Sequence, residues 1–525
     1  MTQDQTNSLI EHGARRYIIT ITVVLCTLLE LIDTTVVNVA TSTLMGNLGA
    51  TISEVSWVIA AYAIANVIVV PMSGFLSSFF GRKYYFAGSV AIFTAASLMC
   101  GLSGSIWTLV FWRFVQGIGG GALFATSQTI LKEIYPPEKI GMAMAMFGMG
   151  VILGPTIGPF LGGYLVYNYS WPVIFYVNIP IGIVAVFLTL TYIRDNPFDK
   201  KQEAGIDWLG IILLIIGIGS LQLVLEQGER NDWFESQYII TFTLLAVGGI
   251  VGFIIRELTA ENPIVDLRVL LKGNVAIATV MNFVLGFILF GSVFIYPIYM
   301  QRFLGFTAQM SGAMFIPGAL LSGMLMPVVG GLLSKGTPPK YMIIGGFLTT
   351  SIFVFWSSFI FTTNTGTEAM YWPLLVRGLG MAFLFVPLSG LTLGGLNGKD
   401  VGQASGISNM IRQIGGSMSV AIIGVLNETL SAEHRANILD HVTPDNILVN
   451  ERLNAMKAGL MSATADADKA AQQALAFLDY SINKQAAILS YIDIFHYLTV
   501  FILISIPLVL FAKTYKLNKD DLGGH

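Results

Sequence analysis

The first long apolar stretch of the chain, residues 17–40, reads YIITITVVLCTLLELIDTTVVNVA. About 20 predominantly apolar residues are enough to cross the hydrocarbon core of a bilayer as a helix. The stretch does not alternate apolar and polar residues, as the strands of an outer-membrane barrel do. It is also too long for the core of a signal peptide and lacks a small-residue cleavage site. It therefore predicts a retained transmembrane helix.

The rest of the chain has the same character. Of its 525 residues, 54% are hydrophobic and 11% are charged, and the mean hydropathy is +0.72, whereas soluble domains carry about 25% charged residues. This composition excludes a water-soluble fold. The net charge of −3 argues against a nucleic-acid partner. Cys26 and Cys100 lie in apolar blocks and predict neither a disulfide framework nor a metal site.

Apolar blocks between charged breaks predict an all-α polytopic membrane protein with fourteen transmembrane helices. The predicted spans are residues 17–42, 54–76, 84–104, 107–131, 141–166, 173–193, 209–226, 238–256, 275–299, 309–333, 341–362, 371–393, 404–427 and 489–512. The tails and loops on one side hold 18 Lys or Arg residues, and the short loops on the other side hold two, Arg230 and Arg302. The positive-inside rule then predicts that both termini are cytoplasmic. The long polar segment 428–488 falls outside, where we expect a small helical element.

Two internal repeats divide the chain. PMSGFLSS at residues 71–78 recurs as PVVGGLLS at 327–334, and GIGGGALF at 117–124 recurs as GLGMAFLF at 378–385. Repeats with the same direction through the membrane are typical of transporters built from two related halves. We therefore predict three units: a six-helix bundle at 1–193, a two-helix insert at 194–274, and a second six-helix bundle at 275–525 that includes the outer segment.

Few ionisable residues fall inside the predicted spans, where their cost makes each a functional hypothesis. Glu30 and Asp33 are three residues apart in the first span and so share one helical face. Arg113 lies six residues into the fourth span, which enters from the other side, so its predicted depth is similar. Opening a buried carboxyl group to water changes its pKa, and a nearby guanidinium lowers it. Asp33 and Glu30 are therefore candidates for binding and releasing a proton, and Arg113 is the candidate group that tunes them. The alternative is an Asp–Arg pair that only fixes helix packing.

The fifth span contains GMGVILGPTIGPFLGG at residues 148–163. Its glycines let another helix approach closely, and its prolines interrupt the backbone hydrogen bonds. The residues of this motif are Gly150, Gly154, Pro155, Gly158, Pro159 and Gly162. Stripes of small residues are common packing devices, but the doubled Gly-Pro is far less common.

The ninth span carries an aromatic stripe beside a polar residue. Its members are Asn282, Phe283, Phe287 and Phe290. At helical spacing, the stripe is a candidate to line a cavity for hydrophobic substrates. Plain helix packing or lipid contact is the more common role of such a stripe.

Nucleotide binding and metal catalysis are not indicated. The Gly398-Lys399 pair has Leu393 where a phosphate-binding loop needs Gly and Asp400 where it needs Ser or Thr, so ATP is not expected as the energy source. No pair of histidines has the spacing of a zinc protease. We expect no enzyme and no cofactor.

These motifs together resemble the fourteen-helix drug:proton antiporters of the major facilitator superfamily, in the EmrB/QacA branch and closest to its EmrB-type members. The resemblance rests on five stretches: residues 31–40 of the first span, Arg113 to Gly117, the Gly-Pro motif of the fifth span, and residues 171–182 and 207–210. The cytoplasmic loop, with Gly74, Gly81, Arg82 and Lys83, also resembles that of the superfamily. It has Ser78 where the general pattern has Asp, which puts a charge relay through that position in doubt.

The resemblance implies proton-driven export of hydrophobic small-molecule drugs by alternating access. From their charge and depth, Asp33 is the leading proton-coupling residue, Glu30 is the second, and Arg113 is the group that tunes them. Asn38, Asn66, Gln116 and the Phe283 stripe are candidates for substrate contact. The EmrB side of the branch implies a bacterial inner-membrane location, with a periplasmic adaptor and an outer-membrane channel as partners. A metabolite importer or facilitator on the same fold and a non-transporting receptor or scaffold remain alternatives. For the outer segment, adaptor docking and a cap over the cavity remain alternatives on the residues alone.

Overall fold

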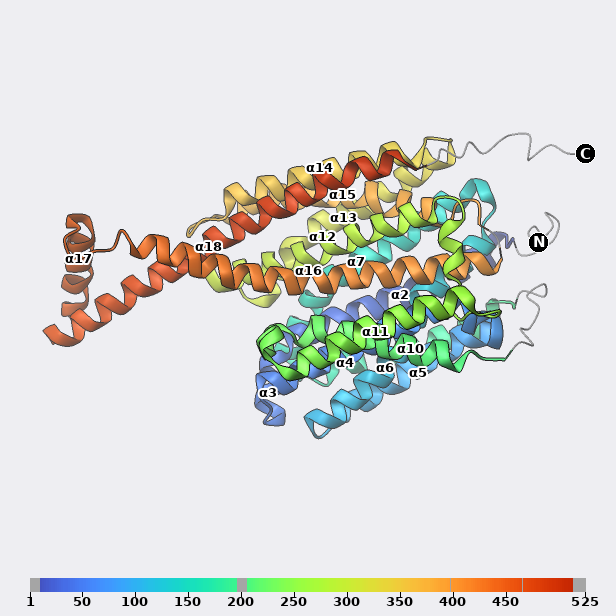
Figure 1. The fold of residues 1–525 in the computed structure, drawn as a ribbon, viewed down its shortest axis with the longest axis horizontal. Helices are drawn as coiled ribbons and strands as arrows, with labels where there is room; N and C mark the ends of the chain where they lie inside the picture. Colours follow the sequence, from blue (N-terminus) through green and yellow to red (C-terminus); the bar gives the residue numbers. More distant parts are fainter. Residues whose placement is uncertain (1–9, 196–204, 397, 465, 513–525) are drawn as a thin grey trace, which may run out of the picture.

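The computed structural model describes residues 10–195, 205–396, 398–464 and 466–512, and the regular elements among them are all helical (Figure 1). The first half contains α2 (Gly13–Val39), α3 (Thr41–Leu48), α4 (Ile52–Phe80), α5 (Arg82–Gly101), α6 (Ile106–Ile134), η1 (Pro137–Lys139), α7 (Ile140–Asn168), α8 (Val173–Tyr176) and α9 (Asn178–Tyr192). The insert contains α10 (Trp208–Gln227), η2 (Glu229–Asn231), η3 (Trp233–Glu235), α11 (Gln237–Thr259) and η4 (Leu267–Leu271). The second half contains α12 (Val275–Phe303), α13 (Ala308–Ser334), α14 (Pro339–Ile360), α15 (Thr367–Leu393), α16 (Lys399–Leu439), α17 (Ile447–Thr464) and α18 (Ala467–Leu510).

The membrane-spanning character of the helices agrees with the sequence. Among the described residues, 13 helical segments are long and apolar enough to cross a bilayer. The remaining predicted span, 107–131, is α6, which has 29 residues. Its length suits a span, but Arg113, Gln116 and a run of glycines lower its mean hydropathy. The prediction of an all-α polytopic membrane protein is confirmed.

Several helices begin where a short polar side chain caps free backbone N–H groups. Thr51 and Glu54 form a capping box at the start of α4. Asp207 accepts a hydrogen bond from the Gly210 N–H at the start of α10, at 3.1 Å. Gly81 has a φ of +85° between α4 and α5, a conformation that favours glycine. These local signals fix the turns between the spans.

The largest contacts between the two halves are made by two helix pairs, α7 with α13 and α4 with α16. Glycines permit the close approach in both pairs. A Cβ at Gly74 of α4 would lie 2.7 Å from the carbonyl carbon of Gly402 in α16, and a Cβ at Gly141 of α7 would lie 2.6 Å from the Gly330 oxygen in α13. The insert helix α10 packs on both α4 and α16. It therefore lies beside the boundary between the halves.

The outer segment 428–488, called the stalk below, extends far beyond the bundle (Figure 1). It consists of the end of α16, all of α17 and the beginning of α18; α16 has 41 residues and α18 has 44. At 1.5 Å per residue each helix is about 60 Å long, twice the hydrocarbon core of a bilayer. The Arg435 side chain donates to Asp479 at 2.9 Å and joins the two helices. The segment is helical, as predicted, but it continues the two membrane helices instead of forming a separate small element.

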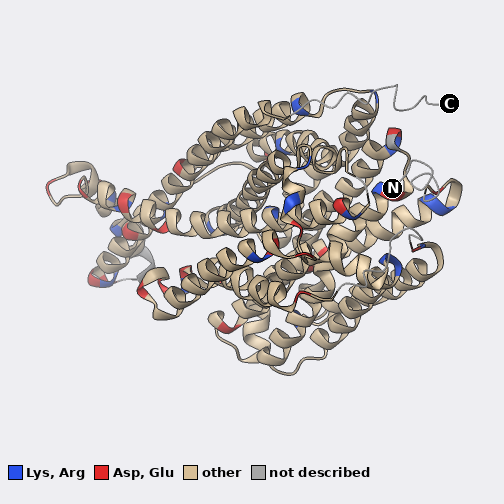
Figure 2. Ribbon diagram, turned by 45° about the vertical axis from the view of Figure 1, so that its right-hand side comes forward, with Lys and Arg blue, Asp and Glu red and all other residues tan. Residues whose placement is uncertain are grey.

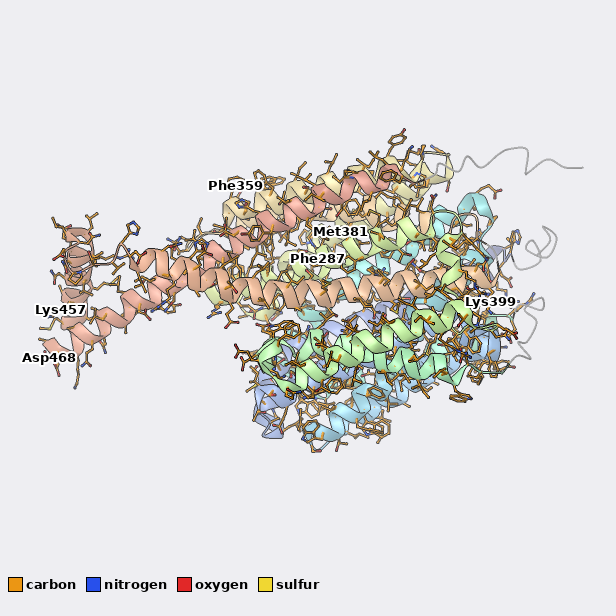
Figure 3. All side chains as sticks on the ribbon, viewed as in Figure 1. Phe287, Phe359, Met381, Lys399, Lys457 and Asp468 are labelled. Carbon is orange, nitrogen blue, oxygen red and sulfur yellow. The ribbon has the colours of Figure 1, made fainter. Side chains whose placement is uncertain are left out.

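The two ends of the molecule differ. Lys399, at the start of α16, lies at one end, and Lys457 and Asp468 lie at the tip of the stalk (Figure 3). The start of α2 and the end of α18 lie at the same end as Lys399 (Figure 1). Acidic residues are frequent along the stalk (Figure 2), which contains eight Asp or Glu residues and five Lys or Arg residues.

Candidate functional site

Asp33 lies at the centre of a buried polar cluster in the first half. One carboxylate oxygen, Oδ2, accepts from Arg113 Nη1 at 2.5 Å. The other, Oδ1, accepts from Gln116 Nε2 at 2.9 Å and from Asn178 Nδ2 at 2.8 Å. Asp33 is 0% exposed and Arg113 is 1% exposed. The donors suit an ionised carboxylate and bring α2, α6 and α9 together at one point.

Arg113 is held on several sides. Its Nη1 also donates to Gln116 Oε1 at 2.7 Å, and its Nε donates to the Val58 carbonyl oxygen at 3.2 Å. Its guanidinium carbon lies 4.2 Å from the centroid of the Tyr62 ring, a favourable cation–π distance. A change of charge at Asp33 therefore acts directly on a cation that contacts both α4 and α6.

Glu30 lies one turn away on α2 and has different partners. Its Oε1 accepts from Asn66 Nδ2 at 3.1 Å, and Asn66 Oδ1 accepts from Gln413 Nε2 of α16 at 2.9 Å. Its Oε2 is buried and has no hydrogen-bond partner among the described residues. The charge of Arg412, on α16, acts on Glu30. The structure thus brings Asp33 and Arg113 together, but it connects Glu30 to the second half.

The glycine stripe of α7 packs on α2, which carries both carboxylates. A Cβ at Gly154 would lie 2.6 Å from the Leu31 Cβ, and a Cβ at Gly162 would lie 2.7 Å from the Val36 Cγ2. The nearest contacts of Gly150 and Gly158 are also on α2, with Val24 and Thr35. Pro155 and Pro159 lie inside the same helix. The motif therefore sets the position of the helix that bears Glu30 and Asp33.

The loop between α4 and α5 is held by carboxylates from the end of α6 and from the segment after α9. Arg82 forms an ion pair with Glu133 at the end of α6. Asp195, which follows α9, accepts from the Lys83 backbone N–H at 2.8 Å, and a Cβ at Gly81 would lie 3.1 Å from the same carboxylate. Ser78 donates locally to the Phe75 carbonyl oxygen. Glu133 and Asp195 were not identified from the sequence, because neither belongs to the quoted motif.

The Phe283 stripe packs between helices of the second half. The Phe287 ring lies 4.8 Å from that of Phe501 in α18. A Cβ at Gly416 of α16 would lie 2.5 Å from the Phe290 ring, and the nearest atom to a Cβ at Gly415 is the Phe283 backbone oxygen. These contacts match the packing alternative. Figure 3 shows Phe287 within the bundle.

Two asparagines among the substrate candidates do not join the polar cluster. Asn282 Nδ2 donates to the Ala278 carbonyl oxygen at 2.9 Å and to Thr392 Oγ1 at 3.3 Å. Asn38 is exposed near the end of α2, away from the polar cluster. Neither asparagine contacts Asp33 or Glu30 among the described hydrogen bonds.

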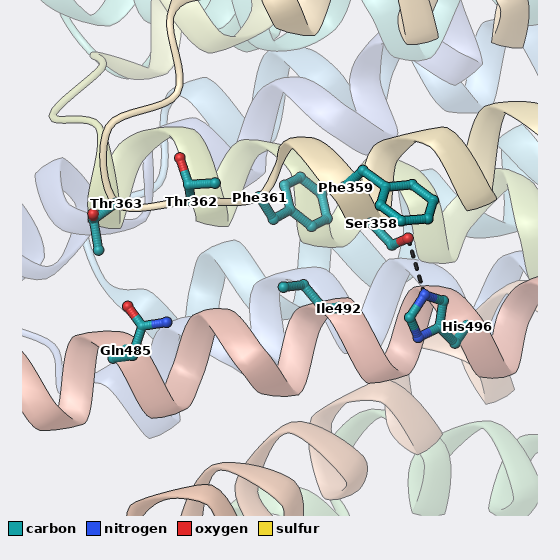
Figure 4. Close-up of a pocket in the computed structure, with 8 residues that line it drawn as sticks. All are labelled: Ser358, Phe359, Phe361, Thr362, Thr363, Gln485, Ile492 and His496. Atoms are coloured by element: carbon teal, nitrogen blue, oxygen red, sulfur yellow. Dashed lines mark hydrogen bonds between the residues drawn. The ribbon is translucent and has the colours of Figure 1, made fainter. Parts of the chain in front are cut away.

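A cavity of about 380 Å³ lies between α14 and α18, where Ser358 and His496 share a hydrogen bond of 3.1 Å (Figure 4). Aromatic side chains, including Phe359 and Phe361, line one part of it, and Gln485 lines another. None of the sequence-predicted site residues lines this cavity. The predicted proton site is a packed polar cluster.

Several polar or ionisable residues inside the spans were not identified from the sequence. Ser97 Oγ accepts from Gln116 at 2.6 Å and from Asn178 at 3.2 Å, but a serine or asparagine in a span carries little signal. An ionisable residue inside a predicted span is a stronger signal of function. Three such residues were missed: Arg377, Arg412 and Glu226. Arg377 is buried and donates to Ser292 at 3.3 Å, and the Arg412 guanidinium lies 4.1 Å from the Phe124 ring centroid.

The chain was compared with known families and proteins. Residues 23–420 match the family model of the Major Facilitator Superfamily. The chain is 34% identical over 501 residues to the Multidrug export protein EmrB of Escherichia coli, covering 95% of this chain and 96% of that protein. It is 32% identical over 502 residues to the Fatty acid resistance protein FarB of Neisseria gonorrhoeae, covering 95% and 97%. The crystal structure of the human organic anion transporter MFSD10 superposes with a TM-score of 0.60 at 12% identity, covering 95% of this chain and 100% of that one.

The family match covers most of the chain, and the similarity to the bacterial relatives extends through nearly the full length of each. The solved structure shares the fold at low sequence identity. The resemblance deduced from the motifs is confirmed. The chain therefore belongs to the major facilitator superfamily, and within it to the EmrB-type multidrug export proteins.

Proposed function

We propose that the protein is a proton-coupled multidrug efflux transporter that exports hydrophobic compounds by alternating access. The observation that carries the proposal is the fully buried Asp33, held by Arg113, Gln116 and Asn178 from two other helices. A buried carboxylate inside the membrane is costly and is retained where a proton or substrate must bind. The names of the relatives, multidrug export and fatty acid resistance, support hydrophobic substrates.

The coupling follows from charge balance. With Asp33 ionised, the Asp33–Arg113 pair is neutral as a whole. When a proton binds Asp33, Arg113 keeps an uncompensated charge, and its contacts to Val58 and Tyr62 on α4 transmit the change to a helix that packs against the second half. The proton gradient supplies the energy, and neither a nucleotide nor another cofactor is needed. In this proposal the protein has no enzymatic activity.

The test uses inverted membrane vesicles with a preformed pH gradient. Ethidium, a lipophilic cation, and laurate, a weak acid, are added as probes. Vesicles with the unaltered protein should lose the gradient when a probe is added, and vesicles with the Asp33→Asn variant should not, because only a titratable group can exchange a proton for a substrate. Substitution of the exposed Asp468 on the stalk, Asp468→Asn, is the matched control and should leave the response intact.

The same assay separates the alternatives. A facilitator would move a probe down its own gradient without affecting the pH gradient. A receptor or scaffold would bind a probe and move neither probe nor proton. A full response in the Asp33→Asn variant would exclude Asp33 as the coupling site, and Glu30 would be the next candidate.

The proposed location is the bacterial inner membrane, with both termini in the cytoplasm. The stalk would then extend about 30 Å or more into the periplasm. Its tip carries strongly exposed apolar side chains, with Ile447 at 72% and Leu448 at 75% exposure. Exposed apolar surface of this kind suits a protein contact. We propose that the stalk binds a periplasmic adaptor that connects the transporter to an outer-membrane channel.

A further inference from the structure

The insert helix α10 carries polar side chains at the boundary between the two halves. Gln227 Nε2 donates to Ser56 Oγ of α4 at 3.3 Å. One turn earlier, Gln222 Nε2 donates to Ser417 Oγ of α16 at 2.7 Å. The insert is thus attached to both halves by side-chain hydrogen bonds within its outer turns.

Glu226 is the ionisable group of this contact. Its Oε1 accepts from Gln222 at 2.9 Å and from Ser417 Oγ at 3.4 Å. It is half-buried in the last turn of α10. The carboxyl group is therefore withdrawn from water yet lies close to the outer surface.

A second observation points to water or protons as the ligand. Gln222 is 2% exposed and its Oε1 has no hydrogen-bond partner among the described residues. Glu30 is also 2% exposed and its Oε2 has none. An unpaired buried acceptor costs free energy unless water or a proton donor reaches it. These two acceptors, Gln222 Oε1 and Glu30 Oε2, lie at opposite ends of a row of polar side chains.

This row of polar side chains follows one face of α16. Ser417 and Gln413 are four residues apart, which places their side chains about 5–6 Å from each other. Gln413 donates to Asn66, and Asn66 donates to Glu30. Toward the outer surface, the Glu229 carboxylate lies close to Gly424 of α16, since a Cβ at Gly424 would lie 2.5 Å from one of its oxygens. Polar groups therefore extend from the outer surface to Glu30 along the seam between α10, α4 and α16.

We propose that α10 provides the outer part of the proton path and that Glu226 is a further proton-binding group on it. This inference rests on the proposed proton coupling. A proton from external water binds Glu226, and water between the Ser417 hydroxyl and the Gln413 and Asn66 amides carries a proton onward to Glu30. Glu226 returns to the carboxylate as Glu30 gains the proton, so the charge balances. The insert then has a role in transport that a helix packed on only one half would lack.

The charges that face this path are few. Arg230 acts on Glu226 from the loop that follows α10, and Glu428 of α16 faces Glu229 at the entrance. Asp33 and Arg412 act on Glu30 at the inner end. The acidic entrance attracts protons.

The test compares two rates in proteoliposomes, with ethidium as the probe, or laurate if the vesicle assay selects it. The first is exchange of labelled for unlabelled probe at equal pH, which needs no net proton movement. The second is probe uptake driven by a pH gradient. Glu226→Gln preserves the hydrogen bonds to Gln222 and Ser417 but cannot titrate. It should leave exchange near the unaltered rate and slow driven uptake by about tenfold or more, as expected when a proton-transfer group is removed.

Two further variants keep the result interpretable. Glu226→Asp retains a carboxyl group and should recover most of the driven uptake. Glu235→Gln removes an exposed carboxylate from the same outer loop and should change neither rate. Unchanged driven uptake in Glu226→Gln, or an equal loss of exchange and driven uptake, would overturn the proposal and leave Glu226 as a packing contact. A lack of any proton flux in the unaltered protein would instead refute the proposed function.

Discussion

At the scale of single residues, the ion pair of Asp33 and Arg113 has two consequences, one for coupling and one for stability. Removing one partner of a buried pair leaves an uncompensated charge and typically costs about 3–5 kcal/mol. Arg113→Ala should therefore lower the thermal unfolding temperature of the purified protein in detergent. It also removes the donors to Gln116 and Val58.

The double variant separates the charge from the packing. Adding Asp33→Asn to Arg113→Ala removes the unpaired carboxylate, so part of the lost stability should return in the same unfolding measurement. Because the two residues are in direct contact, their effects should not add. A double variant that is less stable than Arg113→Ala alone would contradict the assignment of the cost to an unpaired charge.

The meeting of Asp33 and Arg113 could be predicted because both are charged and lie at similar depths in their spans. The partners of Glu30 could not. Its link to Gln413 crosses between the halves, and the order of spans does not specify how two bundles pack. The roles of Asn178 and Ser97 could not be predicted either, since neutral polar residues occur throughout membrane helices and do not by themselves indicate a site.

At the scale of helices, the stripe on α7 sets the position of α2. A methyl group added at Gly154 would meet the Leu31 Cβ at 2.6 Å, closer than atoms can pack, so one helix must shift. Gly154→Ala should reduce proton-coupled transport in inverted vesicles severalfold, since it displaces the helix that carries Glu30 and Asp33. Gly88→Ala is the matched control, because a Cβ there has no atom within 4 Å. Equal rates in the two variants would show that the α2 position is not critical.

The ends of α16 and α18 could not be predicted from the apolar pattern of the sequence. The predicted spans 404–427 and 489–512 end where the sequence becomes polar, which locates the membrane boundary but not the end of a helix. No proline interrupts α16 between Lys399 and Leu439, and no glycine lies beyond Gly424 in it. The helix therefore continues into water until the turn that contains Pro444. Helix α18 likewise starts at the Asp466 cap, far outside its apolar part.

At the scale of the whole molecule, the two halves, the insert and the stalk serve different proposed tasks. The repeats in the sequence were enough to predict two related bundles with an insert, because each repeat marks the same loop or helix in each half. The limits of the three units at 193 and 274 stay a prediction. The packing of α10 against both halves had no signal in the sequence, since an apolar helix with one terminal glutamate resembles any other span.

We expect that most of the stalk can be replaced without disturbing the bundle. Arg435 contacts Asp479 across α16 and α18, so a short Gly/Ser linker in place of residues 437–477 would join the helices just beyond this pair. The shortened protein should retain probe-driven proton flux in inverted vesicles, because Asp33, Glu30 and Glu226 lie outside the removed segment. In cells it should lose drug resistance and fail to retain the adaptor in a pull-down, because adaptor contact is assigned to the stalk.

A finer variant keeps the stalk and changes only its apolar tip. Ile447→Ser with Leu448→Ser removes strongly exposed apolar side chains, which contribute about 1.5–3 kcal/mol each when buried in a contact. Adaptor retention should fall while the fold and the vesicle activity persist. Leu271→Ser, at an apolar residue that is 88% exposed near the other end of the molecule, is the control and should retain the adaptor. Full resistance and full adaptor retention in both stalk variants would assign adaptor contact to another surface and leave the stalk as a cap over the transporter.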